Sequence, residues 1–150
     1  MAKDEADTAV ELRARALRLL ARREHSRREL ERKLSPHAGS SDALDVLLAE
    51  LKTKNQLSEA RFAEERARSM SRKYGAARIR QDLKSKGVSA ELIDRVSSEG
   101  ELERARAILE RKYRQPATTR EERAKRMRFL QSRGFSSEII FSLLSARNTG

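Results

Sequence analysis

Residues 86–93, Lys-Gly-Val-Ser-Ala-Glu-Leu-Ile, decide the fold, because residues 133–140, Arg-Gly-Phe-Ser-Ser-Glu-Ile-Ile, repeat their pattern 47 positions later. Glycine suits the left-handed position that ends a helix, and the serine two residues on can cap the next helix. The apolar residue before each serine, Val88 or Phe135, can pack on the fourth residue of that next helix. The same helix–turn–helix joint therefore occurs twice, which predicts a repeat protein.

A fainter third copy lies upstream. Leu34 stands 49 residues before Leu83, and Leu44 stands 48 residues before Leu92. The intervening turn differs, since it passes through Ser-Pro-His at 35–37, and we expect Ser41 to cap the helix that follows. The chain therefore contains three related units, the first of which departs from the other two at this turn.

Each unit is predicted to have three helices, because apolar residues recur at helical spacing and no stretch alternates as a strand would. Ser26 with Glu29, and Thr119 with Glu122, have the form of capping boxes. The predicted fold is all-α: three tandem three-helix repeats, at 1–57, 58–98 and 99–150, in an elongated, curved array. The expected helices span 8–24, 27–34, 42–53, 59–73, 76–86, 90–98, 100–113, 120–132 and 137–146.

Composition excludes several classes of protein. The 150 residues include 34 Lys and Arg against 23 Asp and Glu, a net charge of +11, with no cysteine and two histidines. Disulfide scaffolds and cysteine-ligated zinc modules are excluded. The N-terminus is polar and acidic, and the longest apolar run is Val46–Ala49, so neither a signal peptide nor a membrane span is predicted. We expect a soluble, cytoplasmic protein.

No catalytic constellation is recognisable. His25 and His37 have no nucleophile arranged with them and are expected at the surface. Carboxylates such as Glu64, Glu65, Glu101 and Glu103 alternate with Arg and Lys, which is typical of solvated helix faces. We therefore expect neither a metal ion nor a cofactor, and no enzymatic activity.

The aromatic residues are few. Tyr74 and Tyr113 could stack on nucleic-acid bases. Both, however, follow the end of a helix, so packing between helices is the favoured role. The four phenylalanines fall in helical registers and are predicted to lie in the core: Phe62, Phe129, Phe135 and Phe141.

The positive charge is concentrated in the second and third units, since residues 1–58 carry +2, residues 59–98 carry +4 and residues 99–150 carry +5. It gathers at the end of each unit's first helix and along its second helix, where Arg120 and Arg133 also lie. A face with many cations and few acids attracts phosphates. The predicted contact residues are Arg72, Lys73, Arg78, Arg80, Lys84, Lys86, Arg111, Lys112, Arg123, Lys125, Arg126 and Arg128.

Three segments in order make the chain resemble the RecX family, whose members regulate the RecA recombinase. They are residues 26–34, Ser-Arg-Arg-Glu-Leu-Glu-Arg-Lys-Leu; residues 57–63, Leu-Ser-Glu-Ala-Arg-Phe-Ala; and Gly75-x-x-x-Ile79-x-x-x-Leu83-x-x-x-Gly87-Val88 with its echo at residues 133–136. The resemblance covers about residues 10–145. It implies three tandem three-helix repeats that bind in the groove of the RecA filament on single-stranded DNA.

The resemblance also implies a function. Such a protein restrains filament extension and suppresses ATP hydrolysis, strand exchange and the co-protease activity that triggers the SOS response. The family offers no catalytic motif to transfer, so the contact residues above rest on charge placement alone. We expect a monomer that contacts the filament protein and, directly, single- or double-stranded DNA.

The residues themselves leave alternatives open. A general nucleic-acid-binding helical repeat protein without a recombinase partner would show the same charge. Sequence-specific recognition of a duplex is disfavoured, because the middle and last helices carry mostly Arg, Lys, Glu and Ser rather than base-reading Asn and Gln. A nuclease is a third class, which the lack of a metal-ligand pattern disfavours.

Overall fold

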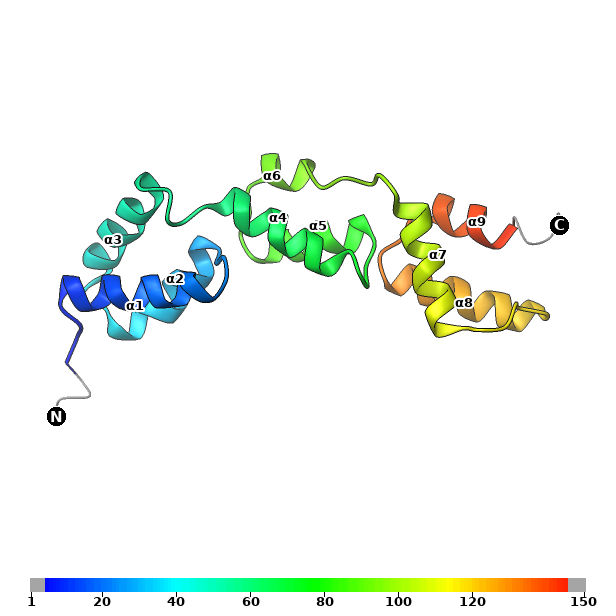
Figure 1. Cartoon of the computed structure of the whole chain (residues 1–150), viewed down its shortest axis with the longest axis horizontal. Helices are drawn as coiled ribbons and strands as arrows, with labels where there is room; N and C mark the ends of the chain where they lie inside the picture. Colours follow the sequence, from blue (N-terminus) through cyan, green and yellow to red (C-terminus); the bar gives the residue numbers. More distant parts are fainter. Residues whose placement is uncertain (1–4, 146–150) are drawn as a thin grey trace. The chain divides into compact units, whose positions relative to one another are not determined.

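The computed structural model describes residues 5–145, which are entirely helical in their regular structure and confirm the all-α fold (Figure 1). Residue 146, the last of the expected final helix, lies outside the described part. Two compact units are formed, one by residues up to Glu65 with Ser85–Ser89 and the other by Arg66–Lys84 with the residues from Ala90 onward. The elements are α1 (Ala9–Arg22), α2 (Arg27–Leu34), the 3₁₀ helix η2 (Ser35–His37), α3 (Ser41–Thr53), α4 (Glu59–Met70), α5 (Ala76–Ser85), α6 (Ala90–Asp94), α7 (Glu101–Lys112), α8 (Arg120–Ser132) and α9 (Ser137–Ser145).

The turn glycines that define the repeat behave as predicted. Gly87 and Gly134 have φ angles of 81° and 88°, in the left-handed region. After Gly134, the Ser136 hydroxyl accepts a hydrogen bond from the Ile139 amide at 3.2 Å and caps α9. Val88 and Phe135, which follow the two glycines, are both buried.

Helix caps follow the sequence with two exceptions. At Ser26 both halves of the capping box with Glu29 are present. Thr119 caps α8, but the Glu122 carboxylate accepts from the Thr118 amide instead of the Thr119 amide. The predicted cap of α3 was wrong: the Ser40 hydroxyl, not the Ser41 hydroxyl, accepts the hydrogen bond from the Ala43 amide.

Two helices end three or four residues before their predicted ends. Helix α4 ends at Met70 instead of 73, where the Lys73 amide already bonds back three residues to Met70. Helix α6 ends at Asp94 instead of 98, because the amides of Arg95 and Val96 likewise bond three residues back. Such bonds tighten the last turn of a helix, and the serines at 97 and 98 are poor residues with which to prolong it.

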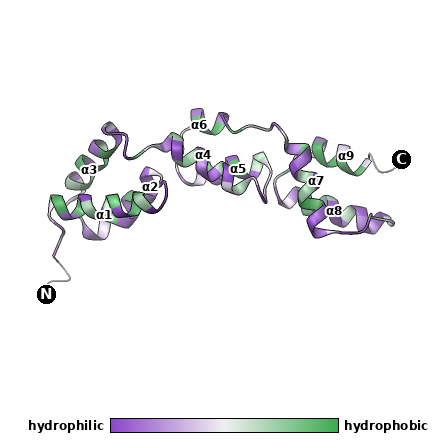
Figure 2. Cartoon of the chain, in the orientation of Figure 1, coloured by the Kyte–Doolittle hydropathy of each residue, from purple (hydrophilic) through white to green (hydrophobic). Residues whose placement is uncertain are grey.

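The apolar residues form separate cores in the first and third repeats. In the first repeat, α1, α2 and α3 pack around buried leucines, among them Leu30, Leu34, Leu48 and Leu51. In the third, α7, α8 and α9 enclose Leu109, Leu130, Phe135 and Ile140. Helix α9 is apolar along most of its length, whereas α8 is mainly hydrophilic (Figure 2). None of the described helices meets the length and hydropathy that a membrane span requires.

The positions of Phe141 and His25 contradict the predictions. Phe141 was expected in the core but is 70% exposed, because its neighbours Ile140, Leu143 and Leu144 take the buried face of α9. His25 was expected at the surface but is 1% exposed.

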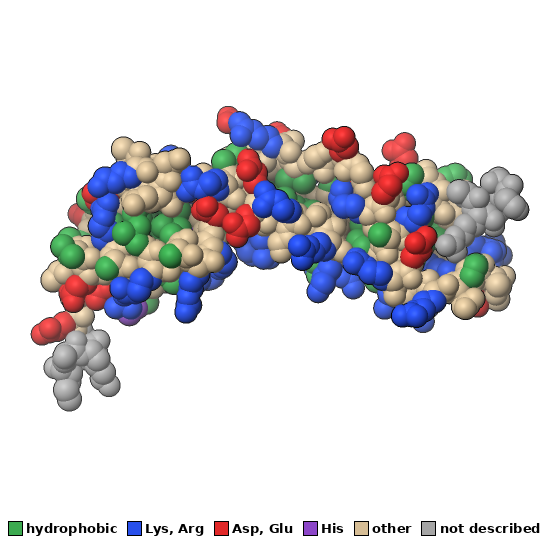
Figure 3. Space-filling view, in the orientation of Figure 1, with side chains coloured by type: hydrophobic (Ala, Val, Ile, Leu, Met, Phe, Trp, Pro, Cys, Tyr) green, Lys and Arg blue, Asp and Glu red, His purple; other side chains and the backbone are tan. Residues whose placement is uncertain are grey.

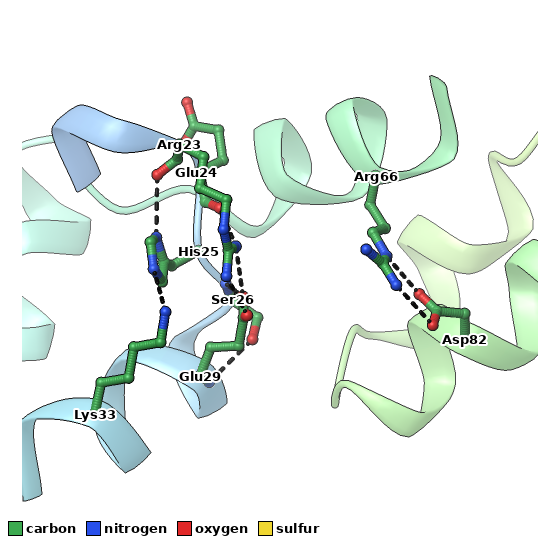
Figure 4. A network of polar contacts seen from close by, with 8 residues as sticks. All are labelled: Arg23, Glu24, His25, Ser26, Glu29, Lys33, Arg66 and Asp82. Atoms are coloured by element: carbon green, nitrogen blue, oxygen red, sulfur yellow. Dashed lines mark hydrogen bonds and ion pairs between the residues drawn. The ribbon is translucent and has the colours of Figure 1, made fainter. Parts of the chain in front are cut away.

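The His25 ring is held from both sides (Figure 4). Its Nε2 lies 3.0 Å from Lys33 Nζ, and its Nδ1 lies 3.0 Å from the Arg23 carbonyl oxygen. An ammonium group can only donate, so Nε2 accepts and Nδ1 carries the proton that is donated to Arg23. Burial, followed by the charges of Arg23 and Lys33, lowers the pKa of His25, while the bond to Arg23 opposes this. The ring is therefore a neutral, structural part of the first unit.

Glu29 sits beside this ring and completes the capping of α2. Hydrogen bonds from the Arg23 guanidinium, the main cause, and from the Ser26 amide lower the pKa of Glu29 to about 2. The carboxylate is thus ionised throughout the neutral range and holds the turn between α1 and α2.

A pair of hydrogen bonds joins the second repeat to the third. The carboxylate of Glu101, the first residue of α7, accepts from the amide of Ala76, the first residue of α5, at 2.8 Å. The Arg78 guanidinium donates to the carbonyl of Ser132, the last residue of α8, at 2.9 Å. Glu101 was predicted on a solvated face and is instead 6% exposed. Its charge is accommodated because it satisfies an otherwise unpaired amide at a helix N-terminus.

The first and second repeats are joined by the same pair of bonds. The Glu59 carboxylate at the start of α4 accepts from the Arg27 amide at the start of α2, at 3.2 Å. The Arg28 guanidinium donates to the carbonyl of Ser85, the last residue of α5, at 3.4 Å. The hydrogen bonds between neighbouring repeats are therefore repeated along the chain as well. Those between the second and third repeats are shorter, and their carboxylate is buried.

Replacing Gly134 tests the tight approach of the backbone at that joint. A Cβ at Gly134 would overlap Arg78, whereas a Cβ at Gly100, also left-handed at φ 72°, would meet nothing within 4 Å. We expect Gly100→Ala to lower the free energy of unfolding by about 1 kcal/mol through backbone strain, and Gly134→Ala by at least about 2 kcal/mol through strain and overlap. Urea unfolding followed by circular dichroism measures both; equal losses would contradict the packing described.

Candidate nucleic-acid interface

The predicted contact cations are mostly exposed. Arg80, Lys86 and Arg123 are half-buried, and Arg126 is an exception, with an exposure of 7%. All except Lys86 belong to the second compact unit. In Figure 3 the Lys and Arg side chains of this unit gather along its lower border, beneath α5 and α8. The exposed predicted residues are Arg72, Lys73, Arg78, Lys84, Arg111, Lys112, Lys125 and Arg128.

Tyr74 is the first of three rings around which the cations gather. The Cζ of Arg78 lies 4.9 Å from the centre of the Tyr74 ring, and the Cζ of Arg133 lies 5.4 Å from it. Tyr74 comes from the α4–α5 turn, Arg78 from α5 and Arg133 from the end of α8. A cation over an aromatic face is attracted by the negative charge of that face.

The third repeat supplies the other two rings. Lys112 Nζ and Arg133 Cζ lie 5.0 and 5.1 Å from the centre of the Phe129 ring. Arg126 Cζ lies 4.5 Å from the centre of the Tyr113 ring, and Lys112 Nζ lies 5.9 Å from it. The Tyr113 and Phe129 rings meet edge to face, with centres 6.0 Å apart.

These contacts link four cations through three rings into one continuous set. We call it the cation–ring row: Arg78, Tyr74, Arg133, Phe129, Lys112, Tyr113 and Arg126. The predicted packing role of Tyr74 and Tyr113 agrees with their half-buried positions. Phe129 is half-buried as well, at the edge of the third core.

Two hydrogen bonds bring the second-repeat part of the row against the third repeat. The Gly75 amide donates to the Arg133 carbonyl at 2.7 Å, which brings the α4–α5 turn against the end of α8. The Arg111 guanidinium donates to the Arg72 carbonyl, also at 2.7 Å. Together with the bonds of Glu101 and Arg78, these contacts fix residues 72–78 against the third repeat.

Two acids on α5 and α8 have partners outside the row. Asp82, the one acid on α5, forms two hydrogen bonds with the Arg66 guanidinium of α4, at 2.8 and 3.2 Å (Figure 4). The Glu122 carboxylate accepts from the Thr118 amide. Among the described residues, none of the ion pairs found within 4.0 Å involves a cation of the row. Arg78 and Lys112, which are exposed, and the half-buried Arg133 therefore present positive charge with no carboxylate in a described ion pair, whereas Arg126 is buried against Tyr113.

The other predicted cations lie outside the row. Arg80 donates to the Val96 carbonyl at 2.8 Å and to the Ser98 hydroxyl at 3.4 Å, and so holds the segment after α6. Lys84, Lys125 and Arg128 are exposed on α5 and α8 and have no part in the ring contacts.

Sequence reasoning missed the central member of the row. Arg133 touches two of the three rings; charge placement included it among the clustered basic residues of the third repeat but not among the predicted contacts. Its position before the left-handed Gly134 was a usable signal, since that glycine ends the helix and fixes the direction of the residue preceding it.

The arrangement supports non-covalent binding of anions. In residues 5–145, no three His, Cys, Asp or Glu side chains come together as ligands for a metal ion.

Two family models match the chain. The RecX second three-helix domain matches residues 58–96, and the RecX third three-helix domain matches residues 99–144. Among curated relatives, the regulatory protein RecX of Leptothrix cholodnii is 44% identical over 89% of this chain and 87% of its own length. The regulatory protein RecX of Ralstonia nicotianae is 42% identical over 89% and 86%, respectively.

Solved structures share the fold. The crystal structure of RecX from Lactobacillus salivarius has a TM-score of 0.80 at 20% identity and covers both chains completely. A crystal structure of a regulatory protein RecX has a TM-score of 0.73 at 22% identity, over 92% of this chain and 73% of the other. The fold similarity agrees with the sequence matches and confirms the resemblance inferred from the repeated segments. This chain belongs to the RecX family of regulatory proteins.

Proposed function

We propose that this protein is a negative regulator of RecA in the cytoplasm. It binds in the groove of the RecA filament on single-stranded DNA and inhibits filament extension, ATP hydrolysis, strand exchange and co-protease activity. In this way it modulates DNA repair and the SOS response. The proposal rests on membership of the RecX family, whose curated relatives carry the description of regulatory proteins.

The observation that carries the proposal at the level of residues is the cation–ring row. Its four cations come from two repeats and are joined within one compact unit. A polyanionic assembly is attracted to such a surface, and several weak contacts along one chain combine into an affinity that no single repeat has. By binding one filament state more tightly than another, the protein shifts the filament towards inactive forms.

We propose further that the three repeats at 1–57, 58–98 and 99–150 are the binding modules, and that the protein acts as a monomer without a cofactor. The remaining predicted cations, such as Lys84, Lys125 and Arg128, extend the surface beyond the row. Each adds a long-range attraction that salt weakens.

The regulator is distinguished from a general nucleic-acid-binding protein by stoichiometry. We expect ATP hydrolysis by RecA on single-stranded DNA to fall by at least half when this protein is about one tenth as abundant as RecA. A protein acting on filaments affects many protomers at once, whereas a competitor must cover the DNA. Inhibition that begins only when the free DNA is coated would contradict the proposal.

The row is tested by reversing two of its charges. Arg78→Glu combined with Lys112→Glu should raise the concentration for half-inhibition about 10-fold or more, since each loses an attraction and adds a repulsion. Arg106→Glu with Arg114→Glu, two exposed positions of the third repeat that belong neither to the row nor to the predicted contacts, makes the same change of charge and should have a clearly smaller effect. Circular dichroism verifies that both variants remain helical. Equal effects would show that only total charge matters.

A further inference from the structure

We propose that the cation–ring row binds the phosphodiester backbone of a single nucleic-acid strand and does not stack on its bases. This deepens the proposed function, on which it rests, by naming the chemistry recognised in the filament. The rings of Tyr74, Phe129 and Tyr113 act as holders of cations, and the cations bind the phosphates.

All three rings of the row already contact cations. Each has two cations over it, at distances between 4.5 and 5.9 Å from the ring centre. Tyr113 and Phe129 also contact each other edge to face. A base could stack on one of these half-buried rings only by displacing a cation that the ring attracts. Base stacking would therefore disrupt the cation–ring contacts that position the cations.

The cations, in contrast, keep donors available. Arg78 uses one N–H bond on the Ser132 carbonyl, out of the five that a guanidinium carries. The ammonium of Lys112 lies over two rings and keeps its three donors for an acceptor in front of it. Ring contacts restrict these long side chains, which lowers the entropy that they lose when a phosphate binds.

A nucleic-acid strand suits the row better than an acidic protein surface does. A strand carries one charge at every nucleotide, which in a duplex is one per about 3.4 Å of helix axis for each strand, and the ring contacts link three cations of the row that reach the surface, Arg78, Arg133 and Lys112. Acidic side chains on a protein surface are interspersed with basic ones, and the row contains no carboxylate to meet such basic groups, since none of the ion pairs among the described residues involves it. Uniform positive charge therefore favours a uniform polyanion.

The test measures, by fluorescence anisotropy and without RecA, the affinity of the full-length protein for three labelled 20-nucleotide oligomers. They are oligo-thymidylate, an abasic oligomer with the same phosphates, and oligo-thymidylate with uncharged methylphosphonate linkages. We expect the abasic oligomer to bind within about 2-fold of oligo-thymidylate, and the methylphosphonate to bind at least about 10-fold more weakly. Loss of affinity on removing the bases would overturn the proposal.

Single substitutions assign the binding to the row. Lys112→Gln, which removes a cation that makes only ring contacts, should reduce the slope of log affinity against log salt concentration by about 0.7 for a single strand. Arg106→Gln is the matched control and should change the slope less. Tyr74→Leu should weaken oligo-thymidylate and the abasic oligomer equally, because the ring acts through Arg78 and Arg133. A loss confined to oligo-thymidylate would show base stacking and overturn the proposal.

Failure here is distinguishable from failure of the proposed function. If neither charged oligomer binds while inhibition of RecA persists, the row recognises protein and this inference is wrong, although the regulator stands. If the oligomers bind as expected but RecA is never inhibited below coating levels, the inference stands and the proposed function is wrong.

Discussion

The hydrogen bond from the Ala76 amide to the Glu101 carboxylate is the contact on which the arrangement of the cation–ring row depends. A helix of 10 residues such as α5 has unpaired amides at its start, and here the next repeat supplies the acceptor. Because that acceptor is a buried negative charge, the joint is specific: moving the third repeat away would leave both the amide and the carboxylate unpaired. The Gly75–Arg133 backbone bond and the Arg78–Ser132 bond then fix the position of Arg133 beside Tyr74.

The row is thus a product of the joint more than of any one repeat. Arg78 and Tyr74 come from the second repeat, whereas Arg133, Phe129 and Lys112 come from the third. In a repeat protein the contacts between neighbouring repeats add to the stability of each repeat, so the contacts that stabilise the joint also position the row. The joint between the first two repeats has longer bonds, 3.2 and 3.4 Å, and a less buried acid, so the same device is present there in a weaker form.

Local patterns in the sequence predicted the helices and turns well, because glycines, caps and apolar spacing act over a few residues. The left-handed conformations of Gly87 and Gly134 and the capping box at Ser26 follow from such short-range rules. Long-range partners were not predictable in this way. The burial of His25 depends on Lys33 and the Arg23 carbonyl, and that of Glu101 on an amide 25 residues earlier in the chain. Charge counting located the basic unit but could not select Arg133 from its neighbours, because that selection depends on how two repeats meet.

The most direct test of this account is the concentration of protein needed to half-inhibit ATP hydrolysis by RecA, compared between Glu101→Ala and Glu103→Ala. Both remove one negative charge from α7, but only Glu101 is buried at the joint, while Glu103 is exposed. If the joint aligns the row, the concentration for half-inhibition should be several-fold higher for Glu101→Ala than for the unsubstituted protein, despite the variant's higher positive charge. For Glu103→Ala it should be the same or lower. Equal or improved inhibition by both variants, each verified as folded by circular dichroism, would show that diffuse charge suffices and would contradict the account.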